Sequence, residues 1–173
     1  NVAFTSNWAE DSRRRDFTMN ALYLAADGEI FDYQDGLRDL RRGKVRFVGD
    51  PATRIREDVL RVLRFYRFHA WLGRGAADPA ARAACRASAP LVSTLSGERV
   101  QAELSKLLRA ADPAATLALM AEDGVLAKIL PGTQPLDILR RLVRLERSLH
   151  LEPDALRRLG ALIAGDAEGV ARR

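Results

Sequence analysis

The sequence changes character at Asp50-Pro51, and this change limits the folds open to the 173-residue chain. Before it, from Asp16 to about Gly49, short apolar segments alternate with turn residues, as is typical of β-structure. After it, apolar residues recur at the three- and four-residue spacing of helices. The pattern predicts an α+β fold, mostly α, in which a small antiparallel β part precedes an all-helical region.

The β part is predicted as a hairpin followed by a third strand. Residues 17–24 and 29–33 form the two strands, with Asp27-Gly28 as a tight turn between them. A short helical turn ends at Gly43, and residues 45–48 form the third strand. Strands this few are not expected to form a stable sheet alone.

Beyond residue 50 the spacing predicts a succession of helices. The first covers about residues 51–73 and carries a buried stripe that includes Val62, Leu63 and Tyr66. Further helices are expected over residues 79–88, from Ser96 or Gly97 to about 110, from an Asp112 cap to Gly124, and over 136–149 and 154–164.

The chain is basic, with a net charge of +5 and 28 lysines and arginines, of which only Lys44, Lys106 and Lys128 are lysines. Guanidinium groups suit planar contacts with phosphates and bases, so the composition favours a polyanionic partner. One group in the helix expected over 136–149 could contact RNA phosphates or simply form a solvated face: Arg140, Arg141, Arg144 and Arg147.

Several classes of site find no support in the sequence. It contains no P-loop, no GxGxxG and no HExxH, and neither His69 nor His150 has neighbouring ligands. The single Cys85 cannot form an intramolecular disulfide, which fits a reducing, cytoplasmic location. The longest apolar stretch, residues 21–26, is too short to span a membrane, and no signal peptide is visible.

Two charged segments stand out instead. Three arginines and an aspartate, Arg13 to Asp16, lead directly into an apolar segment, a costly arrangement unless an anion or an ion pair compensates it. In the segment EDVLRVLRFYRF, Asp58, Arg61, Arg64 and Arg67 recur every three residues. On one helix each would be displaced about 60° and about 4.5 Å from the last. The plainer interpretation is an ordinary helix face with weak ion pairs.

Together these segments resemble a known family. RRRDFTMNAL, DYQDGLRDL, VRFVGDPATRIREDVLRVLRFYRF and SGERVQAELSKLL resemble consecutive motifs of the tRNA nucleotidyltransferase and poly(A) polymerase family, in the class shared by bacterial CCA-adding enzymes. The resemblance covers about Glu10 to Ala110. It implies the end of a nucleotidyltransferase head over residues 1–49, a helical neck with a nucleotide-selecting helix over 50–110, and the start of a helical, RNA-binding body over 111–173.

The resemblance also implies roles for individual residues. Arg15 is expected near the nucleotide triphosphate and sugar, and Asp16 at the ribose hydroxyl. Asp58 and Arg61 are expected to face the base edge. The complete set of expected nucleotide-binding residues is Arg15, Asp16, Asp58, Arg61, Arg64 and Arg67. The supporting residues are Arg14, Glu57, Glu98 and Arg99, of which the last two are expected to brace the selecting helix.

The selecting chemistry follows from donors and acceptors. A carboxylate such as Asp58 only accepts hydrogen bonds, and a guanidinium such as Arg61 only donates them. Cytosine and adenine both present an amino donor beside a ring-nitrogen acceptor, so the pair complements both bases. Uracil and guanine place a carbonyl against the carboxylate, and an unpaired buried polar group costs about 1–3 kcal/mol. The pair therefore predicts selection of CTP and ATP over UTP and GTP.

Two departures from the family pattern matter. The hinge motif has Asp35 where the family usually has the first of two glycines, and aspartate tolerates the left-handed conformation needed there. The family's Asp-x-Asp pair, which holds two metal ions, is expected before the RRD motif, and no such pair precedes Arg13. We therefore expect no catalytic or metal-binding residue in this chain and no activity of the chain alone. Four further carboxylates show no sign of converging on a common metal site: Asp27, Asp32, Asp35 and Asp39.

The leading hypothesis is part of a template-independent RNA nucleotidyltransferase that adds CMP and AMP to the 3′ end of tRNA, with Mg²⁺, CTP and ATP. One alternative is a poly(A) polymerase that uses ATP only. An alternative of another class is a non-catalytic, helical RNA-binding module.

Overall fold

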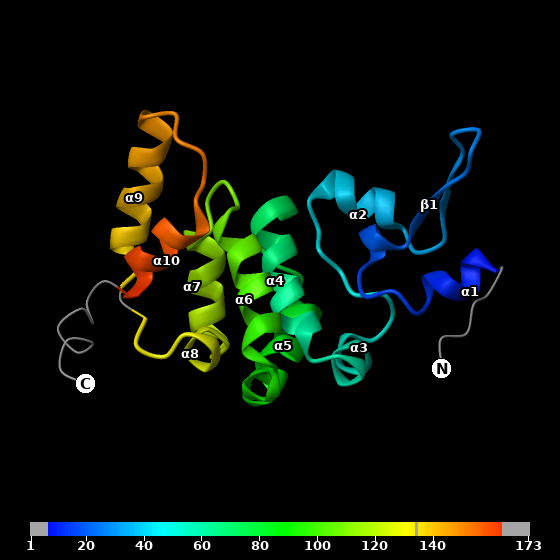
Figure 1. The fold of residues 1–173 in the computed structure, drawn as a ribbon. Coiled ribbons are helices and arrows are strands. Elements are labelled where there is room, and N and C mark those ends of the chain that lie inside the picture. Colours follow the sequence, from blue (N-terminus) through cyan, green and yellow to red (C-terminus); the bar gives the residue numbers. More distant parts are fainter. Residues whose placement is uncertain (1–6, 134, 164–173) are drawn as a thin grey trace.

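The computed structural model describes residues 7–133 and 135–163, and their fold is mostly helical (Figure 1). The helices are α1 (Trp8–Ser12), α2 (Gly36–Arg42), α3 (Pro51–Glu57), α4 (Leu60–Leu72), α5 (Pro79–Ser88), α6 (Gly97–Leu108), α7 (Ala114–Glu122), α8 (Leu126–Ile129), α9 (Asp137–Ser148) and α10 (Ala155–Ile163). Two strands, β1 (Leu22–Leu24) and β2 (Ile30–Asp32), and two 3₁₀ turns, η1 (Thr18–Asn20) and η2 (Ala89–Thr94), complete the described part. The hairpin lies at one end and α9 and α10 at the other.

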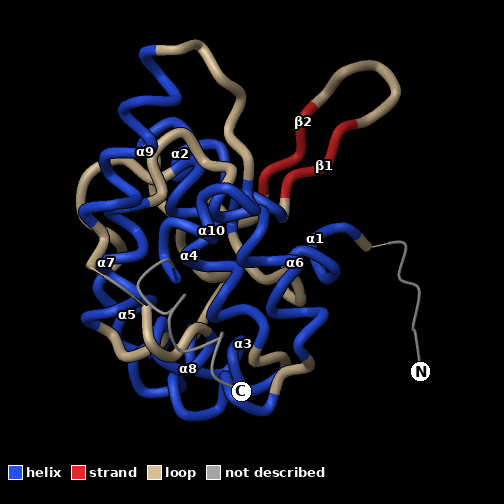
Figure 2. The backbone as a smooth tube through the Cα atoms, turned by 60° about the vertical axis from the view of Figure 1, so that its left-hand side comes forward, coloured by secondary structure: helices blue, strands red, loops and turns tan. Residues whose placement is uncertain are grey.

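The predicted hairpin is confirmed, with β1 and β2 antiparallel and Tyr23 opposite Phe31 (Figure 2). The strand predicted over residues 17–24 is wrong in its first half, where Thr18–Asn20 form a 3₁₀ turn. Asp16 causes the turn, because its Oδ1 accepts hydrogen bonds from the Phe17 backbone and from Asn20 Nδ2. The third strand predicted over residues 45–48 is reduced to an isolated bridge between Phe17 and Phe47.

The left-handed conformation expected at Asp35 is confirmed. Asp35 adopts the left-handed conformation, with φ 59°, immediately before α2. The following Gly36 lies so close to Thr18 that an added Cβ would stand 2.2 Å from the Thr18 carbonyl oxygen. The turn therefore requires glycine at its second position and tolerates aspartate at its first.

The single helix predicted over residues 51–73 is wrong, because the chain leaves the helical conformation at Asp58. Asp58 is extended, with φ −155° and ψ 110°, and separates α3 from α4. Its side chain accepts a hydrogen bond from the Leu60 backbone N–H at 3.0 Å, and so caps the start of α4. Aspartate favours such caps over helix interiors, because its carboxylate competes for nearby backbone donors. Asp58 thus stands before the helix that carries Arg61, rather than on it.

Helix α4 lies at the centre of the core and packs against α5, α6 and α7. The predicted stripe is confirmed, since Val62, Leu63 and Tyr66 are all buried. Phe47 joins the β part to this core: its ring lies 4.6 Å from that of Phe17 and 6.0 Å from that of Phe65. These aromatic contacts fix the segment that carries Asp16 against α4.

Two buried carboxylates tie the helices together. Asp123 accepts hydrogen bonds from the Tyr66 hydroxyl at 2.8 Å and from the guanidinium groups of Arg82 and Arg86. Burial opposes ionisation of Asp123, but these donors outweigh it and hold its pKa below the usual value. Further along, Glu146 pairs with the fully buried Arg158 at 2.7 Å. Such pairs require all their hydrogen bonds, because breaking one leaves a buried charge unpaired.

The other predicted helices agree with the structure within one or two residues, whereas α1 and α8 were not predicted. Helix α5 has the predicted bounds, and α6 begins at Gly97 after Ser96. Helix α7 begins at Ala114, whose N–H is capped by Asp112 Oδ1 at 3.2 Å. Ala164, the predicted end of the last helix, lies outside the described residues. No described helix has both the length and the apolar character needed to cross a bilayer.

Candidate functional site

The break between α3 and α4 holds Asp58 in a defined orientation. Arg99 of α6 donates from Nη2 to both carboxylate oxygens of Asp58, at 2.9 Å each. Oδ1 also accepts from the Leu60 backbone. A carboxylate offers about four lone-pair sites. Oδ2 therefore has room for one further donor, and the Asp58 side chain is 36% exposed to receive it. Arg99 thus holds the Asp58 carboxylate in place, while its bracing of the helix stays a prediction.

Arg61 stands in the same turn, since its backbone N–H donates to the Asp58 carbonyl at 3.1 Å. Its Nη1 donates to Glu57 Oε2 at 2.6 Å and to the Arg54 carbonyl at 3.0 Å. Glu57 and Arg54 thus fix one side of the guanidinium. The donors on Nη2 and Nε are left over, because a guanidinium has five N–H groups in a rigid fork.

The site thus combines one available carboxylate lone pair, on Asp58, with available guanidinium donors, on Arg61. A partner that presents a donor beside an acceptor would satisfy both residues. A partner with an acceptor facing Asp58 would leave that charge opposed by a lone pair. The arrangement can therefore discriminate between planar edges of opposite polarity.

Asp16 lies close to the same helix but is fully engaged. Its Oδ2 accepts from Arg64 Nε at 2.6 Å, and Arg64 Nη2 lies 2.6 Å from the same oxygen. Oδ1 accepts from Phe17 and Asn20. All four lone-pair sites are in use, so Asp16 could bind a sugar hydroxyl only if one of these donors moved away. In this state Asp16 holds Arg64 in place.

Arg67 is held on another side of α4. Its Nε donates to the buried Glu103 of α6 at 2.5 Å, and its guanidinium lies 3.9 Å from the centre of the Phe68 ring. The Arg64 guanidinium lies 5.4 Å from the same ring. The ring of Phe68 packs edge-on against Phe17 at 5.4 Å. Phe68 therefore supports both arginines, a role that the spacing alone did not indicate.

Arg15 makes its contacts with α1 and the hairpin. Its Nε and Nη2 donate to Asp11 Oδ2 at 2.9 Å and 2.5 Å, and its guanidinium lies 5.8 Å from the centre of the Tyr23 ring. Tyr23 also donates to Asp11 at 2.8 Å. The hydrogen bonds from Tyr23 and Arg15 lower the pKa of Asp11. Arg15 is thus preorganised, with half of its side chain exposed.

The predicted residues fall into separate groups. Asp58, Arg61, Glu57 and Arg99 form one connected cluster, whereas Arg15 and Arg67 each have other partners. Arg14 and Glu98 are exposed, and neither side chain has a hydrogen bond or ion pair with another described residue. The sequence analysis missed Asp11, whose four-residue spacing to Arg15 could have revealed it. It also missed Glu103, whose burial no local pattern indicated.

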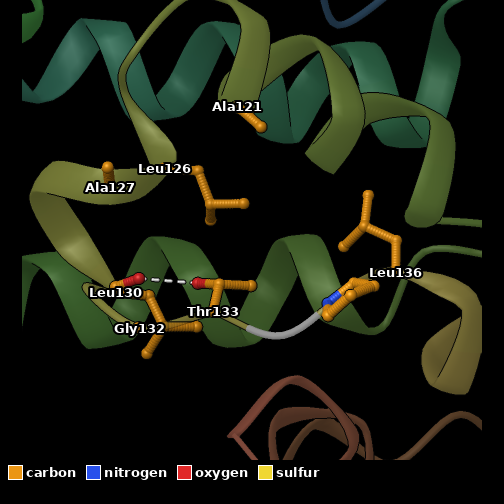
Figure 3. A pocket seen from close by; sticks show the side chains of 8 residues that line it. Ala121, Leu126, Ala127, Leu130, Gly132, Thr133 and Leu136 are labelled. Atoms are coloured by element: carbon orange, nitrogen blue, oxygen red, sulfur yellow. Dashed lines mark hydrogen bonds between the residues drawn. The ribbon is translucent and has the colours of Figure 1, made fainter.

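Other features of the described residues do not add to this site. They contain no cluster of three His, Cys, Asp or Glu side chains able to hold a metal ion. A cavity of about 470 Å³ lies apart from the cluster, between α7, α8 and the loop before α9 (Figure 3). Its lining is largely apolar, with Leu126, Leu130 and Leu136 among the contributors, and it lacks charged groups. It is therefore unsuited to a triphosphate.

Comparison with known proteins gives consistent matches. The family described as "Poly A polymerase head domain" matches residues 1–46, and that described as "Probable RNA and SrmB- binding site of polymerase A" matches residues 77–136. The CCA-adding enzyme of Limosilactobacillus reuteri is 37% identical over 154 residues, which cover 89% of this chain and 38% of the relative. The mitochondrial CCA tRNA nucleotidyltransferase 1 of Danio rerio is 45% identical over 112 residues, 62% of this chain and 25% of the relative.

Solved structures agree with these matches. A Bacillus stearothermophilus CCA-adding enzyme in complex with CTP aligns with TM-score 0.70 and 40% identity, over 83% of this chain and 35% of that one. A tRNA nucleotidyltransferase complexed with a primer tRNA and an incoming ATP analog aligns with TM-score 0.77 and 27% identity, over 95% and 52%. The chain thus spans between a quarter and two fifths of the two curated relatives described above.

Proposed function

The chain belongs to the tRNA nucleotidyltransferase and poly(A) polymerase family, and we propose that it forms the nucleotide-selecting part of a CCA-adding enzyme. The natural protein would transfer CMP and AMP from CTP and ATP to the 3′ hydroxyl of tRNA. The relatives that support this proposal are CCA-adding enzymes, and solved neighbours were crystallised with CTP, with an ATP analog and with tRNA.

The observation that carries the proposal is the pairing of a free acceptor on Asp58 with free donors on Arg61 in one turn. Cytosine and adenine would place their exocyclic amino group against Asp58 and their ring nitrogen against Arg61. Uracil and guanine would oppose a carbonyl to the carboxylate. A hydrogen bond to a charged group contributes about 1.5–3 kcal/mol to binding. A mismatched base that leaves the Asp58 charge unpaired loses at least as much binding free energy. The pair alone would select by one to two orders of magnitude.

The surrounding residues have proposed roles consistent with their contacts. Arg15 and Arg64 would bind the triphosphate and sugar, since each is oriented by a carboxylate and retains exposed surface. Arg67 would support the nucleotide through the shared Phe68 ring. Asp16 would act on the nucleotide mainly through Arg64. We assign Arg99 to positioning of Asp58.

The proposed organisation places the end of a head over residues 1–49, a neck over 50–110 and the start of a body over 111–173. The change from hairpin to helices at Asp50-Pro51 supports the first boundary. Residues 1–6 and 164–173 lie outside the described residues. Magnesium is proposed for the transfer reaction of the natural protein, although the described residues do not form a site that fits it. A cytoplasmic location is proposed from the buried, unpaired Cys85.

The test measures binding of CTP, ATP, UTP and GTP to the purified chain by titration calorimetry. CTP and ATP should bind at least tenfold more tightly than UTP and GTP. In parallel, the natural protein is incubated with tRNA lacking its 3′ CCA and with each nucleotide singly. Incorporation of ATP without CTP would indicate a poly(A) polymerase. RNA binding without nucleotide binding or transfer would indicate a non-catalytic module. Either result would overturn the proposal.

A further inference from the structure

Tyr23 of β1 contacts both members of the ion pair between Arg15 and Asp11. Its hydroxyl donates to Asp11 Oδ2 at 2.8 Å, and the same oxygen accepts from Arg15. Its ring lies 5.8 Å from the Arg15 guanidinium. One side chain on the hairpin therefore fixes the carboxylate and supports the guanidinium that the carboxylate holds.

The same tyrosine fixes helix α1 against the hairpin (Figure 1). Helix α1 has five residues, and a helix this short is not stable in isolation. Its Trp8 stacks on Tyr23, with ring centres 5.4 Å apart and ring planes 4° from parallel, and meets Phe31 of β2 edge-on at 5.1 Å. Asp11 lies on this helix, so its position depends on the hairpin, with Tyr23 as a direct contact.

The ion pair leaves one edge of the Arg15 guanidinium for a ligand. Nε and Nη2 donate to Asp11 Oδ2 at 2.9 Å and 2.5 Å, so Asp11 occupies the side-on edge of the planar group. The end-on edge, formed by Nη1 and the second N–H of Nη2, then points away from Asp11. Two parallel N–H groups match two oxygens of a phosphate. Because the Arg15 side chain is 49% exposed, a phosphate can reach this edge.

Hydrogen bonds connect the arginine run to the base-selecting residues. Arg61 Nη1 donates to the Arg54 carbonyl at 3.0 Å, and Arg54 Nη1 donates to the Arg13 carbonyl at 3.2 Å. Arg15 follows Arg13 by two residues. A phosphate bound at Arg15 is therefore expected to belong to the nucleotide whose base lies at Arg61.

Resting on the function proposed above, we propose that Tyr23 is a positioning residue for the nucleotide triphosphate. It holds Asp11, and Asp11 turns the end-on edge of Arg15 toward the terminal phosphates. An arginine side chain loses much rotational freedom when it binds a ligand, and one that is already held in a single orientation loses less. Without the Tyr23 hydroxyl, Asp11 and Arg15 sample more orientations, and affinity for the triphosphate falls. The base edge, at Asp58 and Arg61, does not change.

The experiment is a double-mutant cycle on the full chain, with Tyr23→Phe and Arg15→Gln made singly and together. Calorimetric titration measures the dissociation constants of CTP, UTP and CMP, and circular dichroism checks the fold. Tyr23→Phe keeps the ring that stacks on Trp8 and removes the hydroxyl. It should weaken CTP and UTP by the same factor, about three- to tenfold, and CMP by less than about 1.5-fold.

The cycle separates a role through Arg15 from a general structural role. In the Arg15→Gln background, Tyr23→Phe should change CTP affinity by less than about 1.5-fold, because the side chain that Tyr23 positions is gone. The matched control is Tyr33→Phe, which removes a hydroxyl from a ring 6.3 Å from that of Tyr23. This control should leave all three affinities unchanged.

Four results would overturn the proposal. An equal loss of CTP affinity in both Arg15 backgrounds, or equal losses for CTP and CMP, would show that Tyr23 supports the fold rather than Arg15. Unchanged or tighter CTP binding by folded Tyr23→Phe would show that the hydroxyl does not orient Arg15 for a phosphate. Unchanged CTP affinity in Arg15→Gln would show that Arg15 binds no phosphate.

Failure of the function proposed above gives a different result. A wild type that binds CTP no more tightly than UTP would refute base selection, whereas the Tyr23 cycle would still decide the positioning role, since both nucleotides carry the same triphosphate. A wild type that binds neither nucleotide would refute the proposed function and the positioning role together.

Discussion

Replacement of Asp58 by asparagine should reverse the polarity of the nucleotide site without disturbing the fold. In the structure Oδ1 accepts from Leu60 and Arg99, and Oδ2 accepts from Arg99 and retains the free lone pair. If the amide oxygen occupies the Oδ1 position and keeps its hydrogen bonds from Leu60 and Arg99, the amide nitrogen occupies the Oδ2 position, where the second hydrogen bond from Arg99 Nη2 is lost. The group that faces the base then becomes a donor. Asparagine is as good an N-cap as aspartate, so α4 should still begin at Leu60.

The expected magnitude follows from the hydrogen bonds involved. CTP loses a charge-assisted bond and meets a donor with its amino group, which costs about 1.5–3 kcal/mol. Because the Asp58 side chain is 36% exposed, water compensates part of the loss, and the lower half of the range applies. CTP binding should therefore weaken about ten- to fortyfold. UTP gains a neutral hydrogen bond of about 0.5–1.5 kcal/mol, so its binding should strengthen a few-fold.

The assay is titration calorimetry of CTP and UTP with the wild type, Asp58→Asn and the control Asp50→Asn. Asp50 likewise accepts a backbone N–H at the start of a helix, that of Thr53 in α3. The control should keep the wild-type ratio of CTP to UTP affinity, whereas Asp58→Asn should lower that ratio by at least tenfold. A folded Asp58→Asn variant with an unchanged ratio would refute the assignment of Asp58 to the base edge.

Three further changes test the framework around the site. Asp123→Asn should lower the free energy of unfolding by about 2–3 kcal/mol in urea titrations, since it weakens the hydrogen bonds from three partners, Tyr66, Arg82 and Arg86. The lowered pKa of Asp123 means that its contribution is present above about pH 4 and is lost as the pH falls through the folded-state value, so the variant should lose less stability on acidification than the wild type. Phe68→Leu should weaken CTP binding about two- to fivefold, since each guanidinium loses a ring contact of about 0.5–1 kcal/mol, with a melting temperature close to that of the wild type. Glu146→Gln should cost about 3–5 kcal/mol by leaving Arg158 buried without a counter-charge, and a loss below 1 kcal/mol in thermal denaturation would contradict that reasoning.

The helical part of the fold was predictable because its signals are local. Helix α5 begins at Pro79 after the Asp78 cap, and α6 begins after Ser96, so start signals and apolar spacing coincide there. The β part was less predictable. Phe17 and Phe47 are residue types typical of strands, but Phe47 packs its ring against Phe65 of α4 and Phe17 packs against Phe68 of the same helix. Their burial depends on a distant helix, which no local window contains.

In the candidate site, too, local features were predictable from the sequence and contacts between distant segments were not. The residue types and their order along the chain were sufficient to select Asp58 and Arg61. Their three-residue spacing suggested a continuous helix. It could not reveal that Asp58 would precede α4, with its carboxylate capping the start of the helix. The partners of the site could not be predicted for the same reason. Glu103 comes from α6 and lies beside Arg67 only in the folded chain.

The helix break has a consequence for selectivity. If Asp58 were part of a continuous helix, its orientation would depend on a freely rotating side chain. In the folded chain the extended backbone, the Leu60 N–H and Arg99 all constrain the carboxylate. Glu57 and the Arg54 carbonyl constrain Arg61 in the same way. Neither group has to give up a protein partner to bind a base, because one lone pair and several N–H donors are already available. Rearrangement of the site therefore does not reduce the difference in binding free energy between a matching and a mismatched base. A protein surface of this kind can discriminate between bases without a nucleic-acid template.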